Sequence, residues 1–483
     1  MSRIHSNVAA LRAIHRAERN QQDLQLRLER LATGLRINRG RDDPAGLIIS
    51  ETLRSEIRGV SQAVSNSIRA SNVLSTAEGA LHEVSALLLE LQALVVATAN
   101  EGALLDEEVR ANQLAVDSIL DSIDRIGNTT TFGNDKLLDG SRAYTLSNVP
   151  TAAFASVAVF AAGLPGNGPR DVVVRVTQSA LPAQVAFLGT NAGGVSRTSA
   201  TTIELRGVGG NELLTFASGT SLQEIRNAIN SLGGALGVSA VVSSPTTGGA
   251  ASALVLASTS LGSDAFVSVE PLSGNFVEAG NVNVLTRGVG TDAGVLVNGV
   301  PAAVTGLRAD VRGNGLDARI HLTQSFGQTL SSAAFTIAGG GALFQLAPEV
   351  SPNGQVTMGF ERIAASRLGN PVVGLLYSLR TGAGNDLDSR NFASAQRIVE
   401  EAIDQVASYR GRLGNLQRSH IDPNINSQRV TLENVTASES MIRDADMAEE
   451  VSSLTRAQIL VQSTNATLQI ANSVPRLVLS LLE

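Results

Sequence analysis

Histidine, lysine and serine are the side chains here that could do chemistry, and their spacing fits no catalytic pattern. His82 and Glu83 begin the HExxH zinc motif, but Ala86 stands where the second histidine belongs. The single lysine, Lys136, follows Asp135, so the GK[ST] end of a phosphate-binding loop is absent. No G-x-S-x-G nucleophile elbow occurs. The sequence therefore predicts no catalytic residues, no cofactor and no metal site.

Composition excludes several further classes. The 483 residues include no cysteine, which rules out disulfide scaffolds and thiolate metal sites. A net charge of −7 and the lack of tryptophan argue against a nucleic-acid partner. The longest apolar run, residues 151–164, is shorter than the ~20 residues of a membrane span, so no membrane partner is expected. Residues 1–30 show no apolar core of a secretory signal, so export would need another route.

The strongest local signals lie in the stretch LATGLRINRGRDDPAG near the start of the chain. Asp42 or Asp43 is well placed as a helix N-cap, with Pro44 at the first helical position. Gly34 and Gly40 weaken the end of the helix before it. The stretch therefore predicts a joint between two helices.

The same stretch carries Arg36, Arg39 and Arg41, which two aspartates cannot all neutralise. Composition leaves two interpretations open for these arginines. They form a solvated face, or they contact another subunit or an anion.

Both ends of the chain have the apolar spacing of packed helices, alternating three and four residues. The first predicted seam consists of Ile14, Ala17, Gln21, Leu24, Leu28, Leu31 and Leu35. Two more helices are expected, one carrying Leu53 to Val95 and one carrying Val109 to Ile123. Near the C-terminus, one seam lies within 395–416, and another consists of Met447, Val451, Leu454, Gln458, Val461, Asn465 and Leu468. The segment DPNIN at 422–426 is expected to separate these two seams.

Residues 141 to about 385 are rich in glycine, serine, threonine and valine. Short alternating runs at 171–176, 202–207, 293–304 and 318–327 predict strands, and 221–232 predicts an amphipathic helix. The fold class is therefore α+β and multidomain, with an antiparallel N- and C-terminal helical coiled-coil or bundle core and a central β-rich insert.

Pairing of the two ends is the economical solution, because a single heptad seam cannot bury itself. Residues 1–50 carry nine arginines against five acidic residues, whereas 440–483 carry three against five. The polar seam residues Gln21, Gln113, Gln458 and Asn465 leave two interpretations open. The seams form a weak bundle within the chain, or they complete their packing only against neighbouring subunits.

Several motifs resemble those of bacterial flagellins, in the same order. At the N-terminus these are LATGLRINRGRDDPAGL and EGAL at 78–81. At the C-terminus they are SYRGRLGNLQ, TLENVTASESMIRDADMAEE, LTRAQILVQS and ANSVPRLVLSLLE. The central GTSLQEIRNAINSLGG and VLVNGVPAAVTGL are similar to insert motifs of flagellins and of the filament cap protein.

The resemblance implies a structural subunit that is exported through the flagellar type III channel and polymerises into the extracellular filament for motility. It implies self-association as a helical homopolymer, together with an export chaperone, the filament cap and hook-junction proteins as partners. The expected domains are 1–44 with 440–483 as inner terminal helices, 45–145 with 355–439 as a helical bundle with a small β element, and 146–354 as a surface-exposed insert. A hook–filament junction adaptor and a filament subunit with an adhesin-like insert are the alternatives.

Three groups of residues are expected to carry assembly. The inner seam is expected to pair four leucines near the N-terminus with four apolar residues near the C-terminus. The N-terminal four are Leu24, Leu28, Leu31 and Leu35, and the C-terminal four are Val451, Leu454, Val461 and Leu468. The joint and its C-terminal counterpart consist of Arg36, Asn38, Asp42, Asp43, Arg443, Asp444, Asp446 and Arg456. For each apolar set, plain core packing is the competing interpretation.

One departure from the family concerns host recognition. Flagellins detected by the animal Toll-like receptor present an arginine, a leucine four residues on, and a glutamate on the next helix. The aligned positions here are Glu90, Leu94 and Ala115, so only the leucine is retained. The resemblance therefore predicts weak stimulation of that receptor.

Overall fold

The computed structural model describes residues 7–100, 102, 104–164, 168–188, 200–243, 253–273, 287–313, 315–370 and 373–480. The first six residues of the predicted N-terminal helix and the last three of the tail lie outside this range. The chain divides into two compact units. Unit 1 comprises residues 1–69, 345–354 and 418–483, and unit 2 comprises 70–344 and 355–417.

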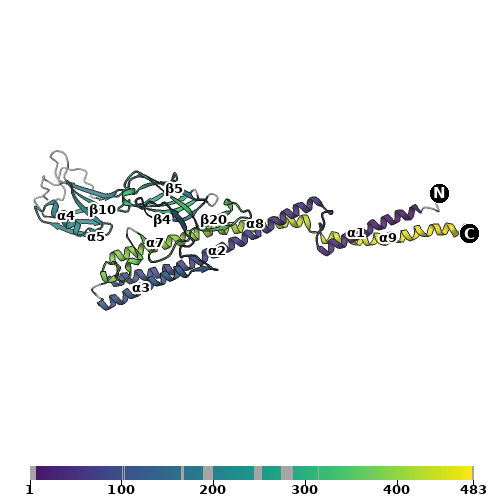
Figure 1. Cartoon of the computed structure of the whole chain (residues 1–483), viewed down its shortest axis with the longest axis horizontal. Helices are drawn as coiled ribbons and strands as arrows, with labels where there is room; N and C mark the ends of the chain where they lie inside the picture. Colours follow the sequence, from purple (N-terminus) through teal and green to yellow (C-terminus); the bar gives the residue numbers. More distant parts are fainter. Residues whose placement is uncertain are drawn as a thin grey trace. The chain divides into compact units, whose positions relative to one another are not determined.

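The two terminal helices of unit 1 lie side by side and antiparallel (Figure 1). Helix α1 spans Val8–Thr33, and the side chain of Asn7 caps its first turn. Helix α9 spans Met447–Ser480. The ends of the chain therefore pair with each other, as the charge and periodicity of the two ends predict.

Helix α2 is one continuous helix, Pro44–Thr98, that runs through both predicted apolar stretches. Its 18-residue window of highest mean hydropathy, 1.6, meets the length and composition of a membrane span. Core helices of soluble proteins pass the same test. Here Leu81, Val84, Leu88, Leu91 and Val95 are fully buried at spacings of three and four, which is typical of a helix that packs on one side.

The helical part of unit 2 combines the end of α2 with α3, Asp106–Thr129, and α7, Phe392–Leu416. Gln113 of α3 is buried with its amide satisfied inside the chain. Its Nε2 donates to the Leu379 carbonyl at 2.9 Å, and its Oε1 accepts from the Leu387 amide at 2.7 Å. Among the four polar seam residues, Gln113 therefore completes its packing without a neighbouring subunit.

The prediction of a break at 422–426 is wrong. Helix α7 continues through a π-helical segment, Gln417–Ile421, into α8, Asp422–Arg443. Pro423 closely follows this π-helical segment, and its missing backbone N–H leaves one carbonyl of the preceding turn without its usual helical donor. The helices separate instead at 444–446, immediately before α9.

Short elements connect the helices and the insert. They are β1 Thr131–Phe132, β2 Asp135–Lys136, β19 Ala342–Gln345, β20 Gln355–Met358, β21 Gly369–Asn370, β22 Gly374–Leu375, and 3-10 turns at Pro352–Gly354, Leu376–Leu379 and Leu387–Ser389.

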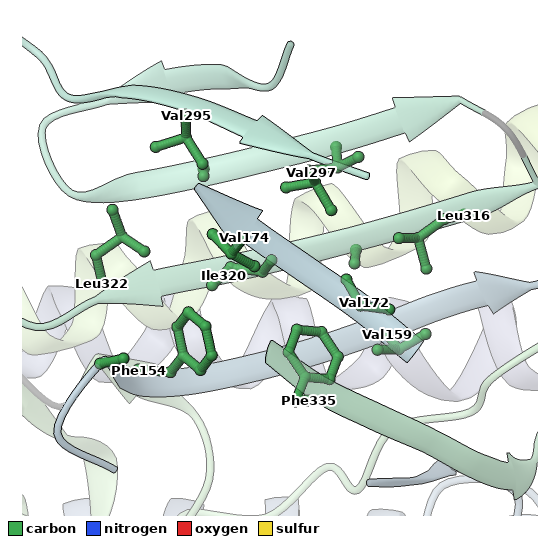
Figure 2. Packing of buried hydrophobic residues seen from close by; sticks show 14 of the residues in the cluster. Phe154, Val159, Val172, Val174, Val295, Val297, Leu316, Ile320, Leu322 and Phe335 are labelled. Carbon is green, nitrogen blue, oxygen red and sulfur yellow. The ribbon is translucent and has the colours of Figure 1, made fainter. Parts of the chain in front are cut away.

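Two sheets of the insert share one hydrophobic core. The first has the order β14-β13-β5-β18-β3 and the second β15-β16-β17-β4. The strands are β3 Tyr144–Ser147, β4 Phe154–Ala162, β5 Arg170–Gln178, β13 Gly294–Val297, β14 Val300–Pro301, β15 Ala303–Thr305, β16 Arg308–Gly313, β17 Leu316–Leu322 and β18 Ser332–Gly340. Figure 2 shows Phe154 and Phe335 in this core, with their ring centroids 5.7 Å apart. The predicted strand at 318–327 ends at Leu322, because Thr323 caps the short helix α6, Gln324–Gly327.

A second hydrophobic core of the insert lies under helix α4, Leu222–Ser231. Its sheets have the orders β6-β10-β9 and β12-β11-β7-β8. The remaining elements are β6 Pro182–Leu188, β7 Thr201–Gly207, β8 Gly210–Phe216, α5 Gly233–Leu236, β9 Val238–Ser243, β10 Ala253–Leu261, β11 Phe266–Ser273 and β12 Arg287–Val289. Ser221 and Glu224 form a capping box at the start of α4, which confirms the amphipathic helix predicted at 221–232.

Candidate functional site

The contact between α1 and α9 has a heptad seam on each helix. On α1 the shielded residues at heptad spacing are Ala10, Ala13, Ala17, Asn20, Leu24, Arg27 and Leu31, and toward its C-terminal end Asp23, Leu26, Glu29 and Arg30 are half-buried as well. On α9 the shielded residues at heptad spacing are Glu450, Leu454, Ala457, Val461, Thr464, Leu468 and Ala471, with Ser453 half-buried beside them. Small and polar side chains make up much of both rows, so the two helices bury little apolar area against each other.

A heptad seam consists of two rows of residues, each repeating every seven positions. On both helices, one observed row is the predicted one and the other is not. The predicted residues that lie in the observed seam are Leu24 and Leu31 on α1, and Leu454, Val461 and Leu468 on α9. The second predicted row is displaced by one residue on both helices, so Ile14, Gln21, Leu28, Val451, Gln458 and Asn465 lie outside the contact. The side chains of Leu28 and Val451 are 47% and 49% exposed. On α1 the facing row is the more polar one, with Asn20 and Arg27 in place of Gln21 and Leu28, whereas on α9 the facing row differs by its small residues Ala457 and Ala471.

Polar contacts fix the register of the pair at three heights. Asn7 Nδ2 donates to the Ala471 carbonyl at 2.8 Å. Near the middle, Asn20 Nδ2 donates to the Leu460 carbonyl at 3.3 Å. Such contacts add little energy each but are made in one alignment only.

The third contact is an ion cluster around Glu450. Its carboxylate accepts from Arg27 Nη1 at 3.1 Å and from Arg30 Nη1 at 3.1 Å, and its side chain is 7% exposed. Burial alone would raise the pKa of Glu450, but hydrogen bonds and charge from the two arginines lower it below its ordinary value of 4.5. Glu450 is therefore ionised and paired at neutral pH.

The joint begins where α1 ends. Gly34 caps α1 with a left-handed φ of 73°, and its carbonyl accepts from the Ala445 amide at 2.9 Å. Leu35 then forms a β-bridge with Asp444. The Arg36 amide donates to the Arg443 carbonyl at 2.7 Å, and its Nη2 donates to the Ile442 carbonyl at 2.6 Å. Backbone of the N-terminal joint therefore pairs with backbone between α8 and α9.

The two aspartates of the joint have different roles. Asp42 Oδ2 accepts from the amides of Asn38 and Arg39 at 3.1 and 2.8 Å, which closes the turn before α2. These hydrogen bonds, that from Arg39 foremost, lower the pKa of Asp42. Asp43 Oδ1 accepts from the Gly46 amide at 2.9 Å and caps α2. The predicted cap is thus Asp43, with Pro44 at the first helical position.

The C-terminal counterpart of the joint is tied to α2 and α9. Arg443 Nη1 pairs with Glu51 at 3.1 Å. Asp444 accepts from the Ser440 hydroxyl at 2.6 Å. Asp446 Oδ1 accepts from the Ala448 amide at 2.9 Å in the first turn of α9.

The remaining candidates lie on exposed or half-exposed helix faces. Arg456 is exposed on α9. Glu90 is exposed and Leu94 half-buried on α2, and Ala115 is half-buried on α3.

Several functional residues were missed from the sequence. Asn7, Asn20, Arg27, Arg30 and Glu450 make the specific α1–α9 contacts, whereas the apolar criterion selects other positions. The ion cluster could have been found by asking which oppositely charged residues of the two ends occupy heptad positions that face each other. Within the described residues, no group of three or more His, Cys, Asp or Glu could hold a metal ion.

Comparison with protein families gives three matches. The bacterial flagellin N-terminal helical region matches residues 4–143, the C-terminal helical region matches 396–482, and the flagellin hook IN motif matches 202–260. Together these stretches cover more than half of the sequence. The chain belongs to the bacterial flagellin family.

Curated relatives agree over the full length. Flagellin B of Helicobacter pylori is 27% identical across 100% of this chain and 99% of the relative. The B-type flagellin of Pseudomonas aeruginosa is 29% identical across 99% of both. The flagellin of Bacillus subtilis reaches 43%, over 29% of this chain and 46% of that one. The chain is therefore a structural subunit of a flagellar filament and not an enzyme.

Solved structures similar to the chain are also flagellar proteins, but the similarity is low. Hook-associated protein 3 of Legionella pneumophila covers 81% of this chain and 98% of its own, with a TM-score of 0.31 and 12% identity. The cap protein FliD of Escherichia coli covers 46% and 64%, with a TM-score of 0.28 and 18% identity.

Proposed function

We propose that this flagellin polymerises through the outer faces of its α1–α9 pair, so that the exposed apolar rows of one subunit pack on those of its neighbours. The observation that carries the proposal is the displaced seam. The pair turns small and polar side chains inward and leaves the apolar Leu28 and Val451 half-exposed.

The exposed apolar side chains extend along both helices. On α1 and α9 they are Val8, Leu11, Ile14, Leu28, Met447, Val451, Ile459, Leu460 and Ile470, each between 39% and 64% exposed. Single exposed apolar residues need no explanation, but rows of them on paired helices are typical of an interaction surface. A two-helix pair with a thin seam gains much of its stability from tertiary or quaternary packing.

The joint is proposed to hold the direction of the terminal pair during assembly. Its hydrogen bonds are largely made by backbone atoms of 34–36 and 443–445. In the proposed filament the terminal helices lie innermost, the helical bundle surrounds them, and the insert faces outward. An export chaperone, the filament cap and hook-junction proteins are the further partners, and the flagellar type III channel is the export route; these come from the family.

Electron microscopy of purified full-length protein, induced to polymerise with precipitating salt and seeds, tests this proposal. The intact chain is expected to give long filaments, and a truncation lacking residues 1–35 none. Leu28→Gln and Val451→Gln are expected to slow elongation strongly while leaving the circular dichroism of the monomer unchanged. Leu213→Gln, on the 60% exposed Leu213 of the insert strand β8, is the matched control and should polymerise normally.

Filaments formed at the normal rate by the truncation or by both helix variants would refute the proposed interface. Soluble monomer or short stubs from the intact chain, even when seeded, would instead favour the hook–filament junction adaptor.

A further inference from the structure

Helix α7 holds the insert sheet that contains β4 and β17 through one concentrated contact in unit 2. Arg412 of α7 pairs with Asp317 and with Asp310, the latter at 3.2 Å. Its guanidinium also lies 3.8 Å from the ring centroid of Phe160 on β4. Arg412 is 7% exposed, and its two carboxylate partners are half-buried. Burial dominates and lowers the pKa of Arg412 to about 10, which leaves it charged at neutral pH.

A second strand residue extends this contact. Arg319 of β17 pairs with Asp310 at 3.0 Å, and its Nη2 donates to the Ser408 hydroxyl of α7 at 3.3 Å. Arg319 therefore joins the strand, the carboxylate and the helix.

Tyr409 ties the loop after β20 to the same face of α7. Its hydroxyl donates to the Gly359 carbonyl at 3.2 Å and accepts from the Glu361 amide at 3.2 Å. Tyr409 is 3% exposed, and burial raises the pKa of its phenol, so it stays neutral. Glu361 is thus fixed by its backbone beside the α7–sheet contact.

A cavity of about 630 Å³ lies next to this contact, between β4, β17, the 361–369 loop and α7. Glu361 and His321 line it. Among the described residues, none of the hydrogen bonds or ion pairs involves the Glu361 carboxylate or the His321 ring. The cavity is large enough for water, which is the partner such groups need.

Other charged groups reach the cavity from each surrounding element. They are Arg319 from β17, Arg362 and Arg367 from the loop, Glu401 from α7, and Asp139 from the segment before β3. Tyr144 contributes a phenol.

Glu361 titrates near neutrality because of this setting. Burial outweighs the attraction of Arg319 and Arg367 and raises its pKa to about 7 from the ordinary 4.5. Burial, with Arg319 and Arg308, lowers the pKa of His321 to about 4 against a weaker opposing effect of Asp310. His321 is consequently neutral when Glu361 changes charge.

The sign of the effect follows from linkage. The folded state holds the Glu361 proton more tightly than the unfolded state, so its contribution to stability falls as pH rises from about 4.5 through about 7. His321 acts oppositely between about 4 and 6.5, so the two offset each other in mild acid. Above 6.5 only the Glu361 effect remains.

We propose that the contact between α7 and the β4–β17 sheet is a proton-controlled fastening of the insert, which loosens when Glu361 loses its proton. The new carboxylate attracts Arg319, which at lower pH holds Asp310 and Ser408. Competition for this one guanidinium weakens the link between strand and helix. The inference concerns unit 2 of the monomer and is independent of the terminal-helix assembly.

Hydrogen exchange of the full-length monomer at pH 6.5 and pH 8.0, corrected for the intrinsic pH dependence of exchange, tests the proposal. Peptides covering 316–322 and 405–413 are expected to lose protection several-fold at the higher pH. Glu361→Gln, which mimics the protonated acid, should remove that loss. Glu401→Gln removes a carboxylate from the same cavity wall and should leave it in place.

Infrared difference spectroscopy of the unmodified chain gives a second readout that needs no variant. A protonated carboxylic acid band should disappear on titration near pH 7 and be missing in Glu361→Gln. Equal pH dependence in the native chain and Glu361→Gln, or no carboxyl band titrating near neutrality, would overturn the proposal.

Discussion

At the scale of single residues, Glu450 shows how a charge can set the alignment of two helices. It is buried on α9, and both of its arginine partners come from a helix more than 400 positions away in the sequence. Removing Glu450 is costly because the shielded Arg30 loses its carboxylate and Arg27 keeps only Asp23, at 3.2 Å.

Glu450→Gln is expected to destabilise the α1–α9 pairing by about 1–3 kcal/mol. The measurement is hydrogen-exchange protection of peptides spanning Arg27 and Ala457 in the monomer. Glu449→Gln, on the exposed neighbour, is the control and should have little effect.

The same cluster should make the pairing sensitive to acid. Because its pKa is lowered in the fold, Glu450 contributes stability above its ordinary value of 4.5 and loses it as pH falls below that value. The native chain is expected to lose protection of the α1–α9 pair between pH 6 and pH 3.5, and Glu450→Gln is not. An unchanged profile of the native chain, or the same loss in Glu450→Gln, would contradict this assignment.

At the scale of elements, Arg412 makes a buried contact between α7 and the insert sheet. Arg410, on the same helix, offers a comparison. Arg412 pairs with two carboxylates and lies against Phe160, whereas Arg410 pairs with Glu78 at 2.7 Å on a more exposed face. The two residues lie on different sides of one helix, and their burial differs more than their chemistry.

Arg412→Ala should lower the stability of unit 2 by about 1.5–3 kcal/mol, because Asp310 and Asp317 lose the hydrogen bonds of a buried guanidinium but keep more exposed arginine partners. Arg410→Ala should cost no more than about 1 kcal/mol. Chemical denaturation of both variants measures the difference. Equal losses of stability in the two variants would show that Arg412 is not the main contact between α7 and the insert sheet.

At the scale of the whole molecule, the surface presented to a host receptor is set by residues on two helices. Family resemblance aligns Glu90, Leu94 and Ala115 with the receptor contacts, and Glu90 is exposed on α2. Reversing a charge at a contact leaves a repelled group and selects against binding.

The chain is expected to stimulate the Toll-like receptor for flagellin weakly in reporter cells. The double variant Glu90→Arg with Ala115→Glu should raise the response by about tenfold or more, which corresponds to about 1.4 kcal/mol. Glu83→Arg, on another exposed position of α2, should leave it low. A native response equal to that of a strong agonist would refute the prediction.

Much of this flagellin follows from its sequence. Helical periodicity, the Asp43 cap before Pro44, the capping box of α4 and the central strands depend on neighbouring residues, and each is found in the structure. The flagellin motifs at both ends likewise need no tertiary information. Local patterns are predictable because the backbone geometry that they specify is decided within a few residues.

Only the tertiary structure decided which row of each terminal helix faces its partner. The periodicity of α1 allows Leu28 or Arg27 in the second row, and apolarity favours Leu28. The structure places Arg27 there, because Glu450 of α9 lies opposite. The same holds for Glu361, whose unusual titration arises from a cavity between segments far apart in the sequence. A helix period describes one helix, whereas pairing energy and burial depend on residues that the fold alone brings together.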